Sequence, residues 1–188
     1  MPKRMCAIFA AFLSGLDDYT ISERGDVGSW VRIACVKGLG SSLQALIHNA
    51  SVIERSAAET LPHSQLGFSA YLPVHTFHDI IGGILKQGVE RLDNVRRCAG
   101  EVFVSLLCLE SPNINEGEKW TISRGRSFRE LLDSTAVGNW SEGSWLYPKA
   151  VHFLDVDIYR QQVLRGLILS IASKIGSTVR LPGIPHCN

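Results

Sequence analysis

The segment LDDYTISERGDVGSWVRIACVKGL, residues 16–39, runs from polar residues straight into an amphipathic pattern. Asp26 lies at the junction, where its carboxylate can accept hydrogen bonds from the free amides of a first helical turn. Gly25 lets the chain bend immediately before that turn. We therefore predict a helix that is capped by Asp26 and whose buried face begins with Val27 and Trp30.

Two glycines, Gly38 and Gly40, interrupt the apolar stripe of this helix. Glycine weakens a helix interior, so the sequence predicts a kink or a split there. Arg32 is predicted to tie the helix to its neighbour, because its aliphatic stem can pack while its guanidinium reaches a carboxylate or a helix end. The stripe consists of Val27, Trp30, Val31, Ala34 and Cys35, continued loosely by Leu39, Leu43, Leu46 and Ile47.

Two more long apolar stripes have helical period. The first comprises Val89, Leu92, Val95, Ala99, Val102, Phe103, Leu106 and Leu107, and it ends at Ser111-Pro112. The second covers Tyr159 to Ile175, with Val163, Leu164, Leu167, Ile168 and Ile171 inward and Gly176 as its stop. Shorter helices are expected over 4–14, 73–87, 126–133 and 144–154, and loops over 55–71 and 111–124. Because strand alternation and hairpin signals are not convincing, the predicted fold class is all-α.

A weak internal echo concerns three arginines. The stretches WVRIAC, NVRRCAG and IYRQQVLRG each place an apolar residue before an arginine near the start of a long apolar helix, and these arginines are Arg32, Arg96 and Arg160. Helices of this kind are typical of HEAT-type repeats, in which helix pairs stack and bury a continuous core. The echo favours a HEAT/armadillo-like α-solenoid with insertions between its repeats.

The composition excludes several classes of protein. The chain has 188 residues, a formal net charge of +1, 45% hydrophobic and 20% charged residues, which is typical of a globular chain and not of a disordered one. A charge so close to zero gives no general attraction to nucleic acid or to an anionic membrane, so neither is expected as a partner.

The N-terminal stretch MPKRMCAIFAAFLSGL fits either a signal peptide or a short buried helix that ends at Gly15. The stretch is too short to span a bilayer, and we favour the buried helix. The five cysteines include no CxxC pair, and Cys187 lies in the tail. We therefore expect reduced, mostly buried thiols in a cytosolic protein.

Motifs that carry chemistry are weak in this sequence. His75-x-x-His78 could place two imidazoles on one helical face, but no carboxylate or thiol accompanies them at ligand spacing. KGLGSS lies inside a helical stripe and lacks the spacing of a P-loop. The acidic pair Asp17-Asp18 is more typical of a solvated loop, and Gly82-Gly83 of close helix packing or a kink. We expect no catalytic residue, no metal and no cofactor.

The aromatic residues carry more information. Tyr19 and Trp30 flank the turn Arg24-Gly25-Asp26. A second group, Trp140, Trp145 and Tyr147, lies where few strong helix formers occur. Tryptophan near arginine is typical of protein-interface anchors, and packing in the core or under loops is the more common alternative.

Three segments of the chain resemble the C-terminal region of the tubulin-folding cofactor D family, also called tubulin-specific chaperone D. The family pattern DDYT…RGDVGSWVR is matched closely by residues 17–32, KQGVERLDNVRRCAGEVFVSLL (86–107) resembles a second family helix, and DIYRQQVLRGLILSIASKIGSTVR (157–180) a third. The resemblance covers about residues 12 to 180, in order.

The resemblance implies a large cytosolic α-solenoid that is a scaffold and not a hydrolase. Such proteins capture β-tubulin and, with cofactors C and E, assemble or take apart the tubulin heterodimer, while an Arf-like small GTPase regulates them. GTP hydrolysis by tubulin is stimulated only within that cofactor complex. The implied location is cytoplasmic and associated with the cytoskeleton. As structural or interaction residues we single out Tyr19, Arg24, Asp26, Trp30, Arg32, Arg96, Tyr159 and Arg160.

The chain departs from the family pattern at its ends. Residues 181–188, LPGIPHCN, do not follow it, and Met1 falls at an internal position of the pattern. We expect a helical-repeat domain over 4–180 with a divergent tail over 181–188, in a chain that is a fragment, a truncated gene copy or an incomplete gene model. The alternative functions are a generic α-solenoid adaptor for protein interactions and a non-functional truncated copy.

Overall fold

The computed structural model describes residues 1–60, 67–132 and 139–178. This part of the chain is almost entirely helical, which confirms the predicted all-α class. Its α-helices are α1 (Pro2–Gly15), α2 (Gly28–His48), α3 (Ala50–Thr60), α4 (Phe68–Tyr71), α5 (Val74–Gly88), α6 (Asp93–Leu107), α7 (Gly125–Leu131), α8 (Gly143–Ala150) and α9 (Asp157–Thr178). Two 3₁₀ helices, η1 (Gly117–Trp120) and η2 (Val151–Asp155), and two short strands, β1 (Ile21–Ser22) and β2 (Gly25–Asp26), complete the described elements.

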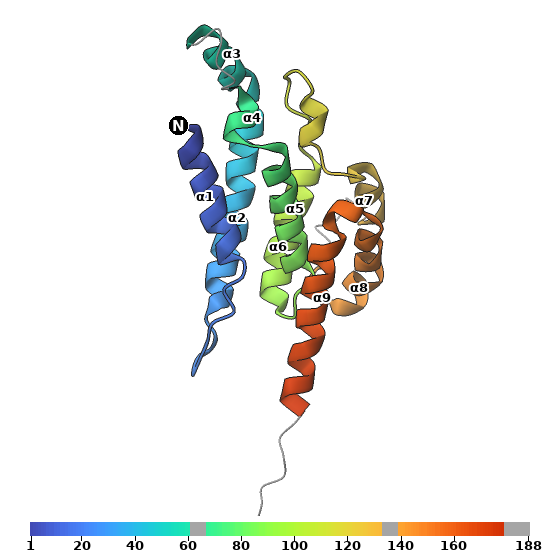
Figure 1. The fold of residues 1–188 in the computed structure, drawn as a ribbon. Coiled ribbons are helices and arrows are strands. Elements are labelled where there is room, and N and C mark those ends of the chain that lie inside the picture. Colours follow the sequence, from blue (N-terminus) through green and yellow to red (C-terminus); the bar gives the residue numbers. More distant parts are fainter. Residues whose placement is uncertain (61–66, 133–138, 179–188) are drawn as a thin grey trace, which may run out of the picture.

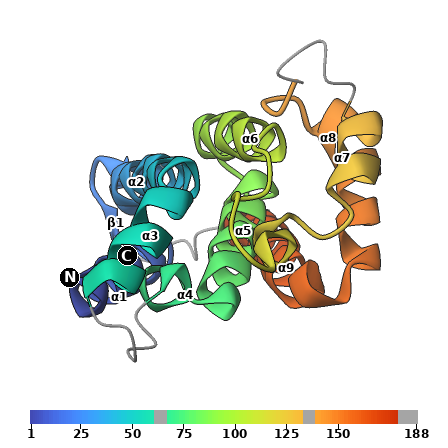
Figure 2. The same ribbon diagram turned by 90° about the horizontal axis from the view of Figure 1, so that it is seen from above.

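The helices are stacked as antiparallel pairs, as the α-solenoid prediction requires. α1 packs on α2 and α5 packs on α6, while α6 lies against α2 and α9 against α5. Figure 1 shows that α1, α5 and α9 run in one direction and α2 and α6 in the opposite one. Seen from above, α1, α5 and α9 lie in one layer and α2 and α6 in a second (Figure 2). Each pair buries its apolar faces against the next pair, which is how helical-repeat proteins form a core.

The loop between α1 and α2 contains a small hairpin that the sequence did not predict. β1 and β2 are antiparallel, with Ile21 opposite Asp26 and Ser22 opposite Gly25. Gly25 has a φ of 97°, which a residue without Cβ adopts at no steric cost. The turn residues Glu23-Arg24 are not of the Asn-Gly type that marks a hairpin in a sequence. The strands form only two residue pairs, which is too short for an alternation of apolar and polar residues to be recognised.

The buried face of α2 differs from the predicted one. Trp30 is 67% exposed and Val31 41% exposed, whereas Arg32 is fully buried. The first turns of the helix instead bury Ser29, Arg32 and Val36. The later members of the predicted stripe are buried as predicted: Cys35, Leu39, Leu43, Leu46 and Ile47. The difference arises at Arg32, because a charged residue was not counted as part of an apolar face.

α2 is also one continuous helix from Gly28 to His48, which contradicts the predicted split. Its two glycines lie at close helix contacts, because a Cβ at Gly38 would meet the ring of Phe12 in α1 and one at Gly40 would meet Val102 in α6. Gly82 and Gly83 of α5 do the same, against α9 and against the end of α1. The glycines therefore serve close approach of neighbouring helices, as one of the two readings of Gly82-Gly83 predicted.

Several predicted boundaries shift. α5 ends at Gly88 and α6 begins at Asp93, so Val89 and Leu92 lie in the intervening turn and not on a helix. The predicted loop 55–71 contains the end of α3 and all of α4, and α9 passes Gly176 and ends at Thr178. The helices predicted at 4–14, 73–87, 126–133 and 144–154 correspond to α1, α5, α7 and α8 with η2. Cys187 and the tail 181–188 lie outside the described residues.

An aromatic cluster joins α6 to the C-terminal third of the array. Phe103 lies 6.0–6.3 Å from the rings of Phe128, Trp140 and Phe153, measured between centroids. Trp140 is 1% exposed, so this member of the predicted aromatic group belongs to the core. Gly100 of α6 lies directly beneath the Trp140 indole, and a Cβ at that position would overlap the ring.

We expect the substitution Gly100→Ala to destabilise the protein although alanine is the better helix former. Overlap with the Trp140 ring should lower the free energy of unfolding by about 1–3 kcal/mol. Urea denaturation followed by circular dichroism measures the effect. Glu101→Ala, an exposed change in the same helix, is the control and should leave the free energy nearly unchanged. Equal stability of the two variants would contradict the packing described here.

Candidate functional site

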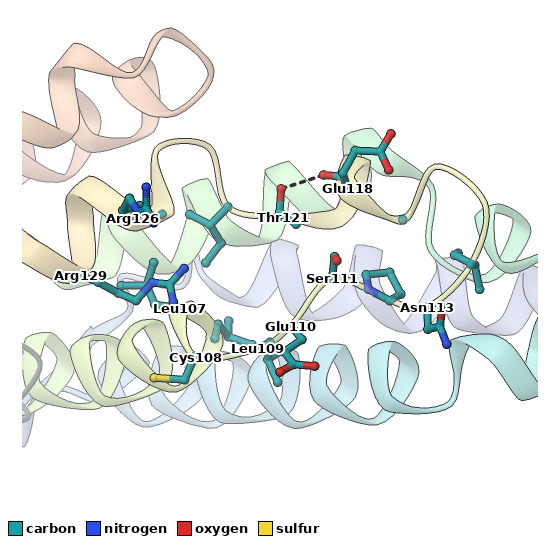
Figure 3. A pocket seen from close by; sticks show the side chains of 16 residues that line it. Leu107, Cys108, Leu109, Glu110, Ser111, Asn113, Glu118, Thr121, Arg126 and Arg129 are labelled. Atoms are coloured by element: carbon teal, nitrogen blue, oxygen red, sulfur yellow. Dashed lines mark hydrogen bonds between the residues drawn. The ribbon is translucent and has the colours of Figure 1, made fainter.

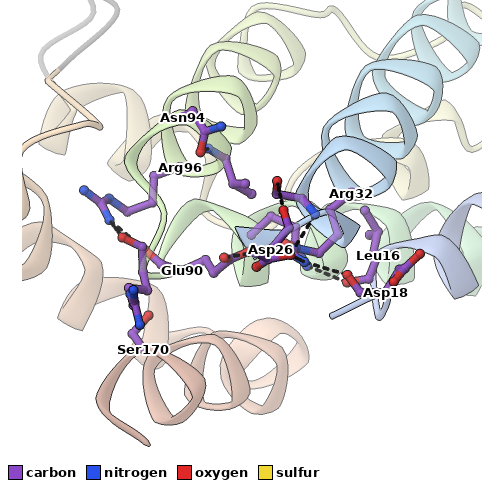
Figure 4. A network of polar contacts seen from close by, with 12 residues as sticks. Leu16, Asp18, Asp26, Arg32, Glu90, Asn94, Arg96 and Ser170 are labelled. Carbon is purple, nitrogen blue, oxygen red and sulfur yellow. Dashed lines mark hydrogen bonds and ion pairs between the residues drawn. The ribbon is translucent and has the colours of Figure 1, made fainter. Parts of the chain in front are cut away.

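Arg32 is the centre of the largest polar network in the described residues (Figure 4). Its guanidinium donates to both carboxylate oxygens of Glu90, at 3.0 and 2.9 Å, and to those of Asp26, at 3.2 and 2.9 Å. A further bond of 2.5 Å reaches the carbonyl oxygen of Asp18. The Tyr19 ring covers the guanidinium, with the Cζ atom 4.3 Å from the ring centroid. Arg32 thus links α2 to the α1–α2 loop and to the turn between α5 and α6.

The start of α2 holds the network in place. α2 begins at Gly28, so Val27 occupies the cap position and Asp26 lies one residue earlier than predicted. The Asp26 carboxylate nevertheless accepts a hydrogen bond of 2.9 Å from the Ser29 amide, as a capping group would, while the Ser29 hydroxyl donates to the Asp26 carbonyl at 2.6 Å. A Cβ at Gly28 would overlap the Asp18 carbonyl, so the loop can close onto the helix only over a glycine.

Charges in this network oppose and compensate one another. Burial raises the pKa of Glu90, and its bonds to Arg32 act against that rise. Burial also disfavours the charge on Arg32, but the hydrogen bonds to Asp26 and Glu90 outweigh it and raise the pKa of the guanidinium. Each partner thus compensates in part for the water that the other has lost.

Arg96 of α6 extends the network through backbone carbonyls. It donates to the carbonyl oxygens of Trp140 at 3.0 Å, Glu90 at 2.9 Å and Ser141 at 2.5 Å, and also to that of Arg91. Glu90 therefore uses its carboxylate for Arg32 and its carbonyl for Arg96. The two arginines meet at this turn and connect the first helix pair to the segment before α8.

Tyr159 forms a separate contact on the other side of α5. Its side chain is fully buried, and its hydroxyl lies 2.9 Å from Nδ1 of His78 and accepts a 3.3 Å bond from the amide of Ser123. The direction of the bond between the hydroxyl and Nδ1 depends on the tautomer of His78. Burial lowers the pKa of His78, against the opposing effects of a backbone bond at Lys119 and the charge of Asp79.

The remaining residues singled out in the sequence lie on the surface. Arg24 is at the tip of the hairpin, where its amide donates to the Ser22 hydroxyl at 3.1 Å. Trp30 projects from α2, and Arg160 pairs with Asp157 at 2.5 Å. The structure thus brings Tyr19, Asp26 and Arg32 together and connects Arg96 to them through Glu90. Sequence reasoning missed Glu90, which lies 58 residues from Arg32 and follows no local pattern.

A hollow of about 450 Å³ lies next to the Arg32 network, and we call it the turn-edge notch. The α5–α6 turn forms its floor, the hairpin one wall and α9 the other, and Figure 1 shows both walls extending beyond the turn. Ile21 at its rim is 77% exposed and Leu169 on α9 is 39% exposed. The notch is lined by Tyr19, Ile21, Gly25, Asp26, Glu90, Arg91, Leu92 and Leu169. Such an arrangement can accept an apolar side chain of another protein.

A larger and more polar hollow, of about 970 Å³, lies between the end of α6, η1 and α7 (Figure 3). Its lining includes Arg126 and Arg129 of α7, Glu110 after α6 and Glu118 of η1. The Thr121 hydroxyl donates to the Glu118 carbonyl at 2.7 Å. No nucleophile and base converge among these lining residues. Within the described ranges, no group of three or more His, Cys, Asp or Glu side chains is placed to hold a metal ion.

No described helix is both long and apolar enough to cross a membrane. Cys35 and Cys98 are buried free thiols, Cys6 is half-buried and Cys108 is exposed.

The comparisons with known proteins agree on one family. The family model described as Tubulin folding cofactor D C terminal matches residues 78–181. A curated relative from Dictyostelium discoideum, Tubulin-specific chaperone D, is 26% identical over 160 residues, which are 82% of this chain and 10% of the relative. The chain therefore spans about a tenth of the length of that relative. No solved structure matches the chain.

We expect Arg32→Ala to lower the free energy of unfolding by about 3–5 kcal/mol, because it leaves the Glu90 carboxylate buried without its partner. Arg24→Ala removes an exposed arginine from the same segment and should cost less than about 0.5 kcal/mol. The double variant Arg32→Met/Glu90→Met should lose less than the sum of its single changes. Urea denaturation of these variants and of the single changes Arg32→Met and Glu90→Met measures this, and additive losses would mean that the pair is not coupled.

We also expect stability to fall on acidification through His78. A histidine whose pKa is lowered by folding contributes its full stability above the unfolded pKa of about 6.5, and that contribution is lost as the pH falls through the folded value. Protonation places a charge on an imidazole whose burial disfavours that charge. Thermal melts between about pH 7.5 and pH 5 should show a shallower decline for His78→Gln than for the native chain. His75→Gln, at an exposed position, should retain the native slope.

Proposed function

Because the chain belongs to the tubulin folding cofactor D family, we propose that it is a helical scaffold that binds tubulin during assembly and disassembly of the tubulin heterodimer. The observation that carries this proposal is the family match over residues 78–181, more than half of the chain. The stacked helix pairs support it, since arrays of this kind present extended surfaces to large protein partners.

The finer proposal concerns the partners. We propose that the chain contacts β-tubulin and works together with the tubulin-folding cofactors C and E, under the control of an Arf-like small GTPase. Its proposed location is the cytoplasm, at the microtubule cytoskeleton. It would stimulate GTP hydrolysis only as part of such a complex, and its own role would be to hold the partners in place without catalysing a reaction.

The turn-edge notch is the surface that we propose for tubulin. Exposed Ile21 and Leu169 offer an apolar contact, and Arg91 offers a charge at the same edge. The bonds of Arg32 and Glu90 fix the floor and the hairpin wall relative to each other, so little conformational entropy is lost when a partner binds. Interfaces often depend on a few such apolar anchors set in a rigid frame.

We expect Ile21→Glu to weaken binding of purified αβ-tubulin to the chain by at least about tenfold, or about 1.4 kcal/mol. The charge would be buried in an apolar contact, while the native fold should persist because the side chain is exposed. Val52→Glu is the matched control, as it places the same charge at a 53% exposed apolar position on α3, which follows the other end of α2 from the hairpin. Biolayer interferometry gives both affinities, and circular dichroism verifies the fold.

Two results would refute the proposal at different levels. A folded chain that captures no tubulin, with or without added cofactors, would refute the tubulin scaffold and favour a generic solenoid adaptor. Tubulin binding that both variants weaken equally would keep the scaffold and exclude the notch as its contact surface.

A further inference from the structure

The outer face of α9 carries an apolar stripe that was predicted to be buried. Leu164, Ile168 and Ile171 are spaced at i, i+4 and i+7, and they are 41%, 60% and 60% exposed. This spacing places the three side chains on one face of the helix. The face that packs on α5 is a different one, formed by Tyr159, Val163 and other residues. α9 therefore has one apolar face that is buried against α5 and a second apolar face, the stripe, that is exposed.

A groove continues this stripe toward α8 and η2. Tyr147 of α8, Val151 of η2, and Leu167, Ser170 and Ile171 of α9 enclose a hollow of about 290 Å³. Val151 is itself 57% exposed. The Ser170 hydroxyl donates to the carbonyl of Val89 at 2.8 Å. We call this surface, together with the stripe, the α8–α9 groove.

The packing of the first two helix pairs indicates which kind of element covers such a face. In the layer that contains α1, α5 and α9, the first two helices pack against the helix of the other layer that comes next in the chain, α2 and α6. In the described residues, α9 packs on α5 and η2 and no helix follows it as α2 follows α1. A third pair built by the same rule would place a helix against the free side of α9.

We propose that the α8–α9 groove is the docking site for an amphipathic helix of a further repeat, whose apolar i, i+3 or i+4 and i+7 side chains contact Leu164, Ile168 and Ile171. A helix laid in an apolar groove is a common recognition mode, and one of its large side chains would enter the hollow between Tyr147 and Leu167. The relative from Dictyostelium discoideum is about ten times longer than the matched segment, so such proteins contain ample chain to supply this helix. The inference is independent of the tubulin proposal.

The test uses a synthetic peptide as the probe. A fluorescent peptide of eighteen residues with Leu at i, i+3, i+4 and i+7 spacing and Glu and Lys elsewhere is titrated with the chain, alongside a scrambled peptide of equal composition. We expect saturable binding of the patterned peptide only. Ile168→Glu should weaken it at least tenfold, because the new carboxylate lies in the centre of the stripe. Val52→Glu should bind like the native chain.

Three outcomes would overturn the inference. In the first, the patterned and scrambled peptides bind alike or neither binds. In the second, Ile168→Glu and Val52→Glu have the same effect on peptide binding. In the third, the peptide does not bind and sedimentation shows a dimer that Ile168→Glu dissociates. The last result would assign the groove to a second copy of the chain. Circular dichroism of both variants must match the native spectrum, as expected for changes at exposed helix positions.

Discussion

The buried ion pair between Arg32 and Glu90 is the constraint on which the arrangement of the first two helix pairs depends. A charge inside a helical core is costly unless every donor and acceptor is matched, and here Asp26, Asp18 and the Tyr19 ring complete the surroundings of the guanidinium. The position of the α1–α2 loop is thereby fixed relative to the α5–α6 turn. Apolar packing alone tolerates small slides of one helix on another, whereas this network allows only one arrangement.

The sequence predicted the general organisation well because stacked helix pairs leave periodic apolar stripes. The stripes over α2, α6 and α9 were strong enough to give the class, and the arginine echo indicated the repeat type. The errors came from residues whose role is set by distant partners. Trp30 was expected inside and Arg32 at an edge, and the structure reverses them because Glu90 neutralises the arginine. No local rule connects two residues that are 58 positions apart.

Glycine was misread for a similar reason. Within a single helix, Gly38 and Gly40 weaken the backbone, and a kink is the natural prediction. Between helices, the same residues permit the close approach of Phe12 and Val102, so the loss in helix propensity is offset by packing. The choice between the two effects depends on which neighbours lie opposite, and that information is absent from a single stripe.

α9 separates the two surfaces that are proposed for partners. Leu169 forms one wall of the turn-edge notch, while Leu164, Ile168 and Ile171 belong to the α8–α9 groove on another face of the same helix. The notch and the hollow of the groove have no lining residue in common. A scaffold needs this property, since it must hold one partner while it contacts another. Exposed apolar residues on α9, which would be a liability in an isolated domain, are consistent with a helix in the interior of a longer array.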